Sequence, residues 1–102
     1  MALLAVTYHA QGRYDEAERL EDEALALRRE VLGEKHPDTI WSMASLAATY
    51  HAQGRYDKAL QLHQTALEIR RHVLGENHPD TMQSVAYLAS TQDALQQLPP
   101  LA

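Results

Sequence analysis

The fold is decided by the stretch Tyr8-His9-Ala10-Gln11-Gly12-Arg13-Tyr14-Asp15, which returns unchanged 42 residues later as Tyr50-His51-Ala52-Gln53-Gly54-Arg55-Tyr56-Asp57. A second stretch, Val31-Leu32-Gly33-Glu34-Lys35-His36-Pro37-Asp38-Thr39, returns with one change as Val73-Leu74-Gly75-Glu76-Asn77-His78-Pro79-Asp80-Thr81. Residues 1–42 match residues 43–84 at 28 of 42 positions, whereas chance would give about two or three for an ordinary composition. A fixed period of this length is typical of a solenoid, in which each unit buries its apolar face against its neighbours.

Each unit is predicted to form two helices. Between Pro37 and Gln53 the apolar residues recur at helical spacing, and they are Ile40, Met43, Ala44, Leu46, Ala47 and Tyr50. Pro37 suits the first helical position, and Gly54 can supply the left-handed residue that ends the helix. A second helix is expected from Tyr56 to Leu74, closed by Gly75. The short connections make neighbouring helices antiparallel, so the predicted fold class is all-α.

Over the whole chain, the period predicts one domain with about five helices. Its parts are a truncated first repeat (1–36), a complete second repeat (37–78), the capping helix of a third (79–98) and a tail (99–102). The helices are expected at about 1–11, 14–32, 37–53, 56–74 and 79–96. In the last helix, Gln92 and Asp93 replace Tyr50 and His51, as expected for a terminal cap that has no successor to pack on.

The apolar and small residues of the repeat resemble the tetratricopeptide repeat (TPR) signature. The matching elements are Leu46-Ala47-x-x-Tyr50, Gly54-x-Tyr56, Ala59 and Ala66-Leu67. The 42-residue period and the linker Leu-Gly-Glu-x-His-Pro-Asp-Thr resemble the kinesin-light-chain-type subclass. They are also similar to arrays in fungal and bacterial nucleotide-binding receptor-like proteins. The resemblance implies a right-handed α-solenoid whose concave wall is lined by the first helix of each hairpin, and a protein-binding scaffold without catalysis.

The same resemblance implies a set of groove-facing residues. They are Val6, His9, Trp41, Ser45, Ala48, His51, Gln83, Tyr87, Ser90 and Asp93. Helical spacing independently places Trp41, Ser45 and Ala48 on one stripe, offset from the core stripe of the same helix. The subclass usually carries Asn beside the Leu-Ala pair, where this chain has Leu3, Ser45 and Tyr87. Trp41 and Tyr87 either anchor a partner, as large rigid aromatics do at hot spots, or pack on a neighbouring hairpin or chain.

The composition excludes several classes of protein. Acidic residues outnumber basic ones 14 to 9, for a net charge of −5, and a nucleic-acid partner would require a basic face. No stretch approaches the length of a membrane span, and no basic segment with a long apolar core marks a signal peptide. There is no cysteine, which fits a reducing compartment. A soluble cytoplasmic protein is expected, with a protein or peptide partner.

The six histidines do not predict a metal site. His9 and His51 lie one repeat apart, as do His36 and His78, so members of each pair are expected on neighbouring hairpins rather than at one point. His36 and His78 are predicted to act at helix starts, and His9 and His51 are either groove donors or exposed. No Ser–His–acid order or Gly-rich phosphate loop occurs. No enzymatic activity, cofactor or metal is therefore predicted.

Charged residues near the helix ends and apolar residues of the helix after Gly12 lead to further predictions about exposure and self-association. The acidic run of the helix after Gly12 is predicted to be a solvated face, with attraction of a basic partner as the alternative. The pairs Arg28-Arg29 and Arg70-Arg71, near the ends of two successive helices, are predicted to complement the helix dipole, with anion binding as the alternative. Self-assembly is the alternative function. Leu20, Leu25 and Leu27 are candidates for an exposed apolar face, which a homodimer through exposed solenoid ends would bury. The chain is also compatible with a fragment of a larger receptor-like protein.

Overall fold

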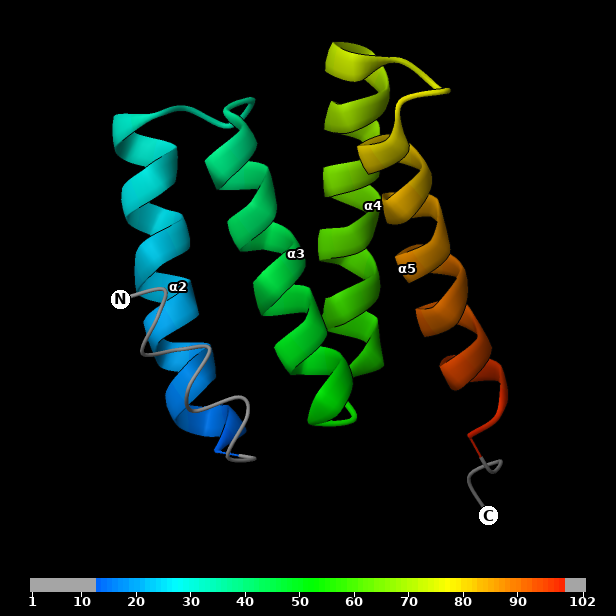
Figure 1. The fold of residues 1–102 in the computed structure, drawn as a ribbon. Helices are drawn as coiled ribbons and strands as arrows, with labels where there is room; N and C mark the ends of the chain where they lie inside the picture. Colours follow the sequence, from blue (N-terminus) through cyan, green and yellow to red (C-terminus); the bar gives the residue numbers. More distant parts are fainter. Residues whose placement is uncertain (1–12, 99–102) are drawn as a thin grey trace.

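The computed structural model describes residues 13–98, which form four α-helices in an antiparallel succession (Figure 1). The helices are α2 (Tyr14–Val31), α3 (Pro37–Ala52), α4 (Tyr56–Leu74) and α5 (Pro79–Gln96). Each helix packs on the next along the chain. The all-α fold of stacked hairpins is confirmed. The helix predicted at 1–11 and the tail 99–102 lie outside the described residues.

Histidine and proline start both first helices of the hairpins in the same way. The imidazole Nδ1 of His36 accepts a hydrogen bond from the backbone N–H of Asp38 at 3.1 Å, and His78 does the same for Asp80 at 3.1 Å. Proline follows each histidine at the first helical position, where its missing N–H costs nothing. The predicted role of these histidines at helix starts is confirmed.

Glycine ends the helices as predicted. Gly54, between α3 and α4, has φ +79°, and Gly75, between α4 and α5, has φ +91°. This left-handed region is open to glycine and costly for residues with a Cβ. The chain therefore reverses within a few residues, and consecutive helices lie side by side.

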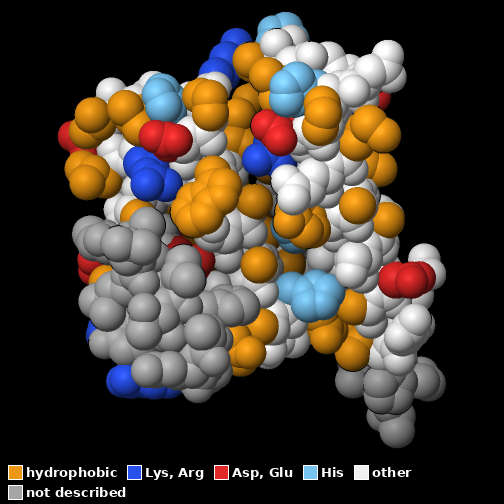
Figure 2. Space-filling view, in the orientation of Figure 1, with side chains coloured by type: hydrophobic (Ala, Val, Ile, Leu, Met, Phe, Trp, Pro, Cys, Tyr) orange, Lys and Arg blue, Asp and Glu red, His pale blue; other side chains and the backbone are white. Residues whose placement is uncertain are grey.

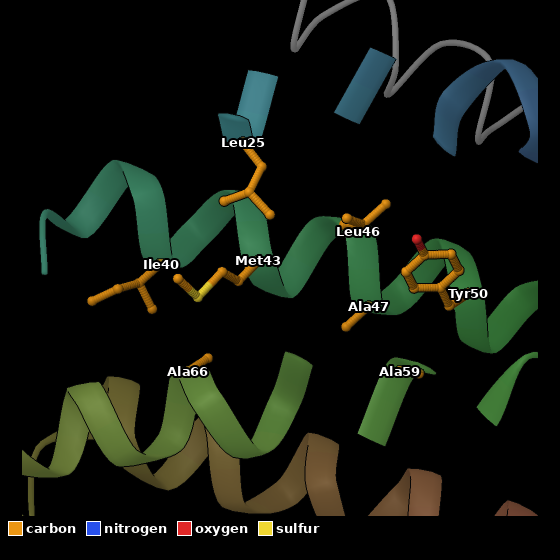
Figure 3. Packing of buried hydrophobic residues seen from close by; sticks show 8 residues of the cluster. All are labelled: Leu25, Ile40, Met43, Leu46, Ala47, Tyr50, Ala59 and Ala66. Atoms are coloured by element: carbon orange, nitrogen blue, oxygen red, sulfur yellow. The ribbon is translucent and has the colours of Figure 1, made fainter. Parts of the chain in front are cut away.

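The core lies on both sides of α3 (Figure 3). Met43 and Ala47 of α3 are fully buried against α4, where Ala59 and Ala66 present small side chains that let the two helices approach closely. Leu25 of α2 packs on the other side of α3. Leu25 was predicted to be a candidate for the exposed face of its helix, and this prediction is wrong, because this side of α2 packs on α3.

An arginine crosses each boundary between hairpins. Arg28 Nη1 in α2 donates to the backbone oxygen of Asp38 at 3.1 Å and to Ser42 Oγ at 2.5 Å, both in α3. One repeat later, Arg70 Nη1 donates to the Asp80 oxygen at 3.2 Å and to Ser84 Oγ at 2.7 Å. Arg70 is buried. We call this repeated contact the arginine bridge; it binds the second helix of one hairpin to the first helix of the next.

The acidic run of α2 is not wholly solvated, which corrects the sequence-based expectation. Thr49 of α3 donates its hydroxyl hydrogen to the carboxylate of Glu21, which is half-buried. Glu18 pairs with Arg55 in the turn after α3. Burial raises the pKa of Glu21 from 4.5 to about 6, although the hydrogen bond from Thr49 acts in the opposite direction. The folded chain therefore binds a proton at Glu21 more readily than the unfolded chain does.

Glu21→Gln is expected to raise the free energy of unfolding at pH 7 by about 1 kcal/mol, after allowance for solvent screening of this half-buried group. The reason is that the raised pKa favours the protonated carboxyl in the folded state, so the stability that Glu21 contributes falls as pH rises from 4.5 through 6. Urea denaturation at pH 4 and pH 7 measures the effect. Glu23→Gln, exposed on the same helix, is the control; equal gains from both variants would contradict the prediction.

Candidate functional site

A groove of about 440 Å³ is lined by residues of α3 and α5, together with His63 of α4. Its lining comprises Trp41, Ala44, Ser45, Ala48, His51, His63, Gln83, Tyr87, Ser90 and Thr91. Figure 2 shows this face, with hydrophobic side chains and histidine gathered around the hollow between the two helices. Both walls come from first helices of hairpins. These two helices, α3 and α5, are separated in the chain by α4 alone. The groove between them therefore follows from the repeated helix–helix arrangement.

Two exposed aromatic side chains line the groove from different walls. Trp41 of α3 is 47% exposed and Tyr87 of α5 is 42% exposed. The Arg28 guanidinium lies 5.9 Å from the Trp41 ring centroid, within the range of a cation–π contact. Gln83 Nε2 donates to the Tyr87 hydroxyl at 3.0 Å. Both rings are thus oriented by neighbouring polar groups while part of their surface stays accessible.

His63 forms the back of the groove. It comes from α4, is 4% exposed, and its ring stacks on Tyr87 with centroids 5.5 Å apart and planes at 30°. Burial lowers the pKa of His63 from 6.5 to about 4, and the nearby His51 and Arg70 contribute to the same shift. At pH 7 the imidazole is therefore neutral, and Tyr87 rests on an uncharged ring.

His51 links the two walls at one end of the groove. Its Nδ1 lies 3.2 Å from Thr91 Oγ1 of α5, a hydrogen bond that spans α3 and α5. Its ring meets Tyr56 edge-on, with centroids 5.0 Å apart. Since Thr91 is buried, this contact holds α5 against the end of α3 and limits how far the groove can open there.

The chemistry of the groove is that of a neutral, partly apolar surface. None of its ten lining residues is Asp, Glu, Lys or Arg. Ala44, Ser45 and Ala48 give the α3 wall small side chains, which leave room for a bulky group from outside. Hydroxyl, amide and imidazole groups around them can exchange hydrogen bonds with a peptide. Within residues 13–98, no three His, Cys, Asp or Glu side chains converge closely enough to hold a metal ion.

The structure brings most of the predicted groove residues together. Those that line the groove are Trp41, Ser45, Ala48, His51, Gln83, Tyr87 and Ser90. Asp93 is exposed and is not part of the lining. Val6 and His9, the other two predicted residues, lie outside the described residues.

Sequence reasoning missed Ala44, Thr91 and His63, which also line the groove. His63 was missed because only first helices were expected to contribute. A signal existed: His63 stands one repeat after Glu21, and each lies four residues after an alanine and four before a leucine, on one face of its helix. In both, burial disfavours the charged form.

Comparison with known proteins places this architecture in a family. The sequence model of the tetratricopeptide repeat matches residues 1–72 and, in an overlapping register, residues 44–99. The chain belongs to the tetratricopeptide repeat family. TPR arrays generally mediate protein–protein interactions. A comparison with curated proteins gives no match.

Solved structures place the TPR chain near the kinesin-light-chain type, as its linker predicted. One is a Podosopora anserina protein described as a kinesin light chain with nearly identical TPR-like repeats, at 29% identity and a TM-score of 0.86. A single-residue variant of that protein gives the same identity and TM-score. The TPR chain is covered over 94% of its length and spans 46% and 45% of those two chains, about half of each. No helix of residues 13–98 is long and apolar enough to cross a bilayer.

Proposed function

We propose that this TPR chain is a protein-interaction module that binds an uncharged peptide segment or helix of another protein in the groove between α3 and α5, and that it catalyses no reaction. The observation that carries the proposal is the lining of the groove, which has accessible Trp41 and Tyr87, several small residues and no Asp, Glu, Lys or Arg. Large aromatics beside small residues are typical of sites that receive an anchor side chain. The cytoplasmic location and the similarity to receptor-like proteins stay predictions.

The size and the neutrality of the groove define the expected ligand. Its volume of about 440 Å³ falls in the range of roughly 300–1,000 Å³ that ligand pockets occupy. An aromatic or aliphatic side chain would fill the space beside Ala44 and Ala48, while backbone groups of the peptide would bond the hydroxyl and amide groups around it. A charged side chain placed there would lose its hydration without gaining a partner.

The test uses Trp41, which is the only tryptophan of the chain, as a built-in fluorophore. Three peptide pools are titrated: uncharged peptides rich in aliphatic and aromatic residues, acidic peptides and basic peptides, all free of tryptophan. We expect the uncharged pool to change the Trp41 emission most, with little dependence on salt because no ion pairs are involved. No change with any pool, or a salt-sensitive response to a charged pool alone, would contradict the proposal.

A matched pair of variants locates the binding site. Ala48→Arg places a long cation inside the groove, and Ala52→Arg places the same side chain one turn further along α3, outside the lining. Both alanines are exposed, so neither change should unfold the helix. Ala48→Arg is expected to abolish the response to the uncharged pool, and Ala52→Arg is expected to retain it.

Trp41→Ala is expected to weaken binding of a selected uncharged peptide by about 30-fold or more, as the loss of a hot-spot aromatic worth about 2 kcal/mol does. Because this variant lacks the fluorophore, anisotropy of a labelled peptide measures the affinity. Val73→Ala, which truncates another exposed apolar side chain away from the groove, is the control. If both variants bind alike, Trp41 is not the anchor.

A further inference from the structure

One face of α5 exposes the side chains that the corresponding face of α3 buries. Met82 and Val85 of α5 are 60% and 43% exposed. They stand one repeat after Ile40 and Met43 of α3, which are 3% and 0% exposed. Ala89, one repeat after the buried Ala47, is exposed as well. We call Met82, Val85 and Ala89 the α5 face.

The chain itself shows what covers such a face. On α3, the equivalent residues pack against α4, whose Ala59, Leu62, Ala66 and Ile69 belong to or contact the same core cluster. Their spacing is Ala-x-x-Leu-x-x-x-Ala-x-x-Ile, with two buried alanines seven residues apart. A helix with this pattern therefore fits the α5 face as α4 fits α3.

The charges of α5 further restrict the partner. The helix contains Asp80 and Asp93 and no lysine or arginine, and the whole chain carries a net charge of −5. An acidic helix would therefore be repelled, and a neutral or basic one attracted. The helical turn of α5 that follows Ala89 is polar, since Gln92 occupies the position at which α3 has the buried Tyr50. The apolar contact thus covers the first half of α5.

We propose that the α5 face is a second docking surface, separate from the groove, and that it binds an antiparallel amphipathic helix of another molecule with an α4-type alanine spacing and a neutral or basic polar face. The contact would reproduce between molecules the packing of α4 on α3. A single helix pair buries less area than a standard interface of about 1,600 Å², and a short free helix must also be ordered on binding. The interaction is therefore weak.

Two peptides from the chain serve as probes. The peptide Tyr56–Leu74 has the sequence of α4, with three basic and two acidic residues, and the peptide Tyr14–Val31 has that of α2, with three basic and seven acidic residues. Both carry the same apolar spacing, because Ala17, Leu20, Ala24 and Leu27 stand one repeat before Ala59, Leu62, Ala66 and Ile69. Fluorescently labelled peptides are titrated with the full chain and followed by anisotropy.

The α4 peptide is expected to bind, and the α2 peptide is expected to bind at least several-fold more weakly at low ionic strength, with a smaller difference in high salt. Met82→Glu and Val85→Glu in the chain are each expected to weaken binding of the α4 peptide by about 10-fold or more, since each buries an unpaired charge in the contact. Both sites are exposed, and circular dichroism verifies that the helices are retained. Trp41→Ala should leave this binding unchanged, which separates the α5 face from the groove.

Three results would overturn the proposal. They are no binding of the α4 peptide, equal binding to the wild-type chain and to Met82→Glu, and self-association of the chain that light scattering detects and Met82→Glu removes. The last result would assign the α5 face to a second copy of the chain. Because the readout is independent of Trp41, each result leaves the test of the groove intact.

Discussion

Met43→Ala is expected to lower the free energy of unfolding by about 2–5 kcal/mol, the range for truncating a large buried side chain to alanine. Met43 is fully buried at the centre of the core cluster, between α3 and α4. Its neighbours there include Ala47 and Ala66, which are too small to fill the cavity that truncation would leave. Small domains are stable by only about 5–15 kcal/mol, so the variant should unfold at much lower urea concentration.

Met82→Ala supplies the matched control for Met43→Ala. It removes the same side chain from α5, where Met82 is mostly exposed, and surface changes of this kind usually lie within about 0.5 kcal/mol. Urea denaturation followed by circular dichroism at low protein concentration compares the two variants. Equal losses of stability would mean that the packing of α3 on α4 does not hold the array together.

Acidification from pH 7 to pH 4 is expected to cost about 2–3 kcal/mol of stability through His63 alone. Its pKa is lowered from 6.5 to about 4, chiefly by burial, so the unfolded chain takes up the proton more readily. The stability that the neutral imidazole contributes is fully present above pH 6.5 and is lost as pH falls through 4. Protonation would also place a charge beneath the stacked Tyr87.

His63→Gln is expected to flatten this part of the pH profile, because glutamine cannot take up the proton. The comparison is best made in the Glu21→Gln background, since Glu21 acts in the opposite direction between pH 4.5 and 6. His72→Gln, exposed on the same helix, is the control and should leave the slope in place. A profile that His63→Gln does not alter would show that the imidazole is not held neutral by burial.

Much of the fold could be predicted from the sequence because the residues that begin and end helices recur in each repeat. The bounds of α3, α4 and α5 agree with the expected ranges to within one or two residues, since Pro37, Pro79, Gly54 and Gly75 mark helix ends by local chemistry. The buried stripe of α3 also followed from its spacing. The prediction for Leu25 failed because helical spacing shows which side of a helix is apolar but does not show that the following helix, α3, packs on that side.

The groove was predicted less completely than the fold. Its walls could be placed because Trp41, Ser45 and Ala48 form a stripe on one helix, which spacing alone determines. His63 was not placed, because it reaches the groove from behind, and a polar residue in a helix is most often solvated. Arg28 and Arg70 were expected to complement the ends of their own helices, and their contacts with the next helix were not predicted. The recurrence of Arg and Ser fourteen residues apart, as Arg28 with Ser42 and Arg70 with Ser84, was the available signal.

The arginine bridges have a mechanical consequence. Each one joins two hairpins through a single guanidinium that contacts both a main-chain oxygen and a serine hydroxyl, so it resists rotation of one hairpin against the next. The two boundaries share this contact and differ in one other: Thr39 Oγ1 donates to the backbone oxygen of Arg28 at 3.4 Å, whereas the equivalent hydroxyl of Thr81 is buried without a hydrogen-bond partner among the described residues. The curvature of the wall that carries Trp41 and Tyr87 can therefore be altered at one boundary at a time. Removal of the Ser84 hydroxyl would loosen the boundary between α4 and α5, the helix that carries Tyr87, and leave the boundary between α2 and α3 unchanged.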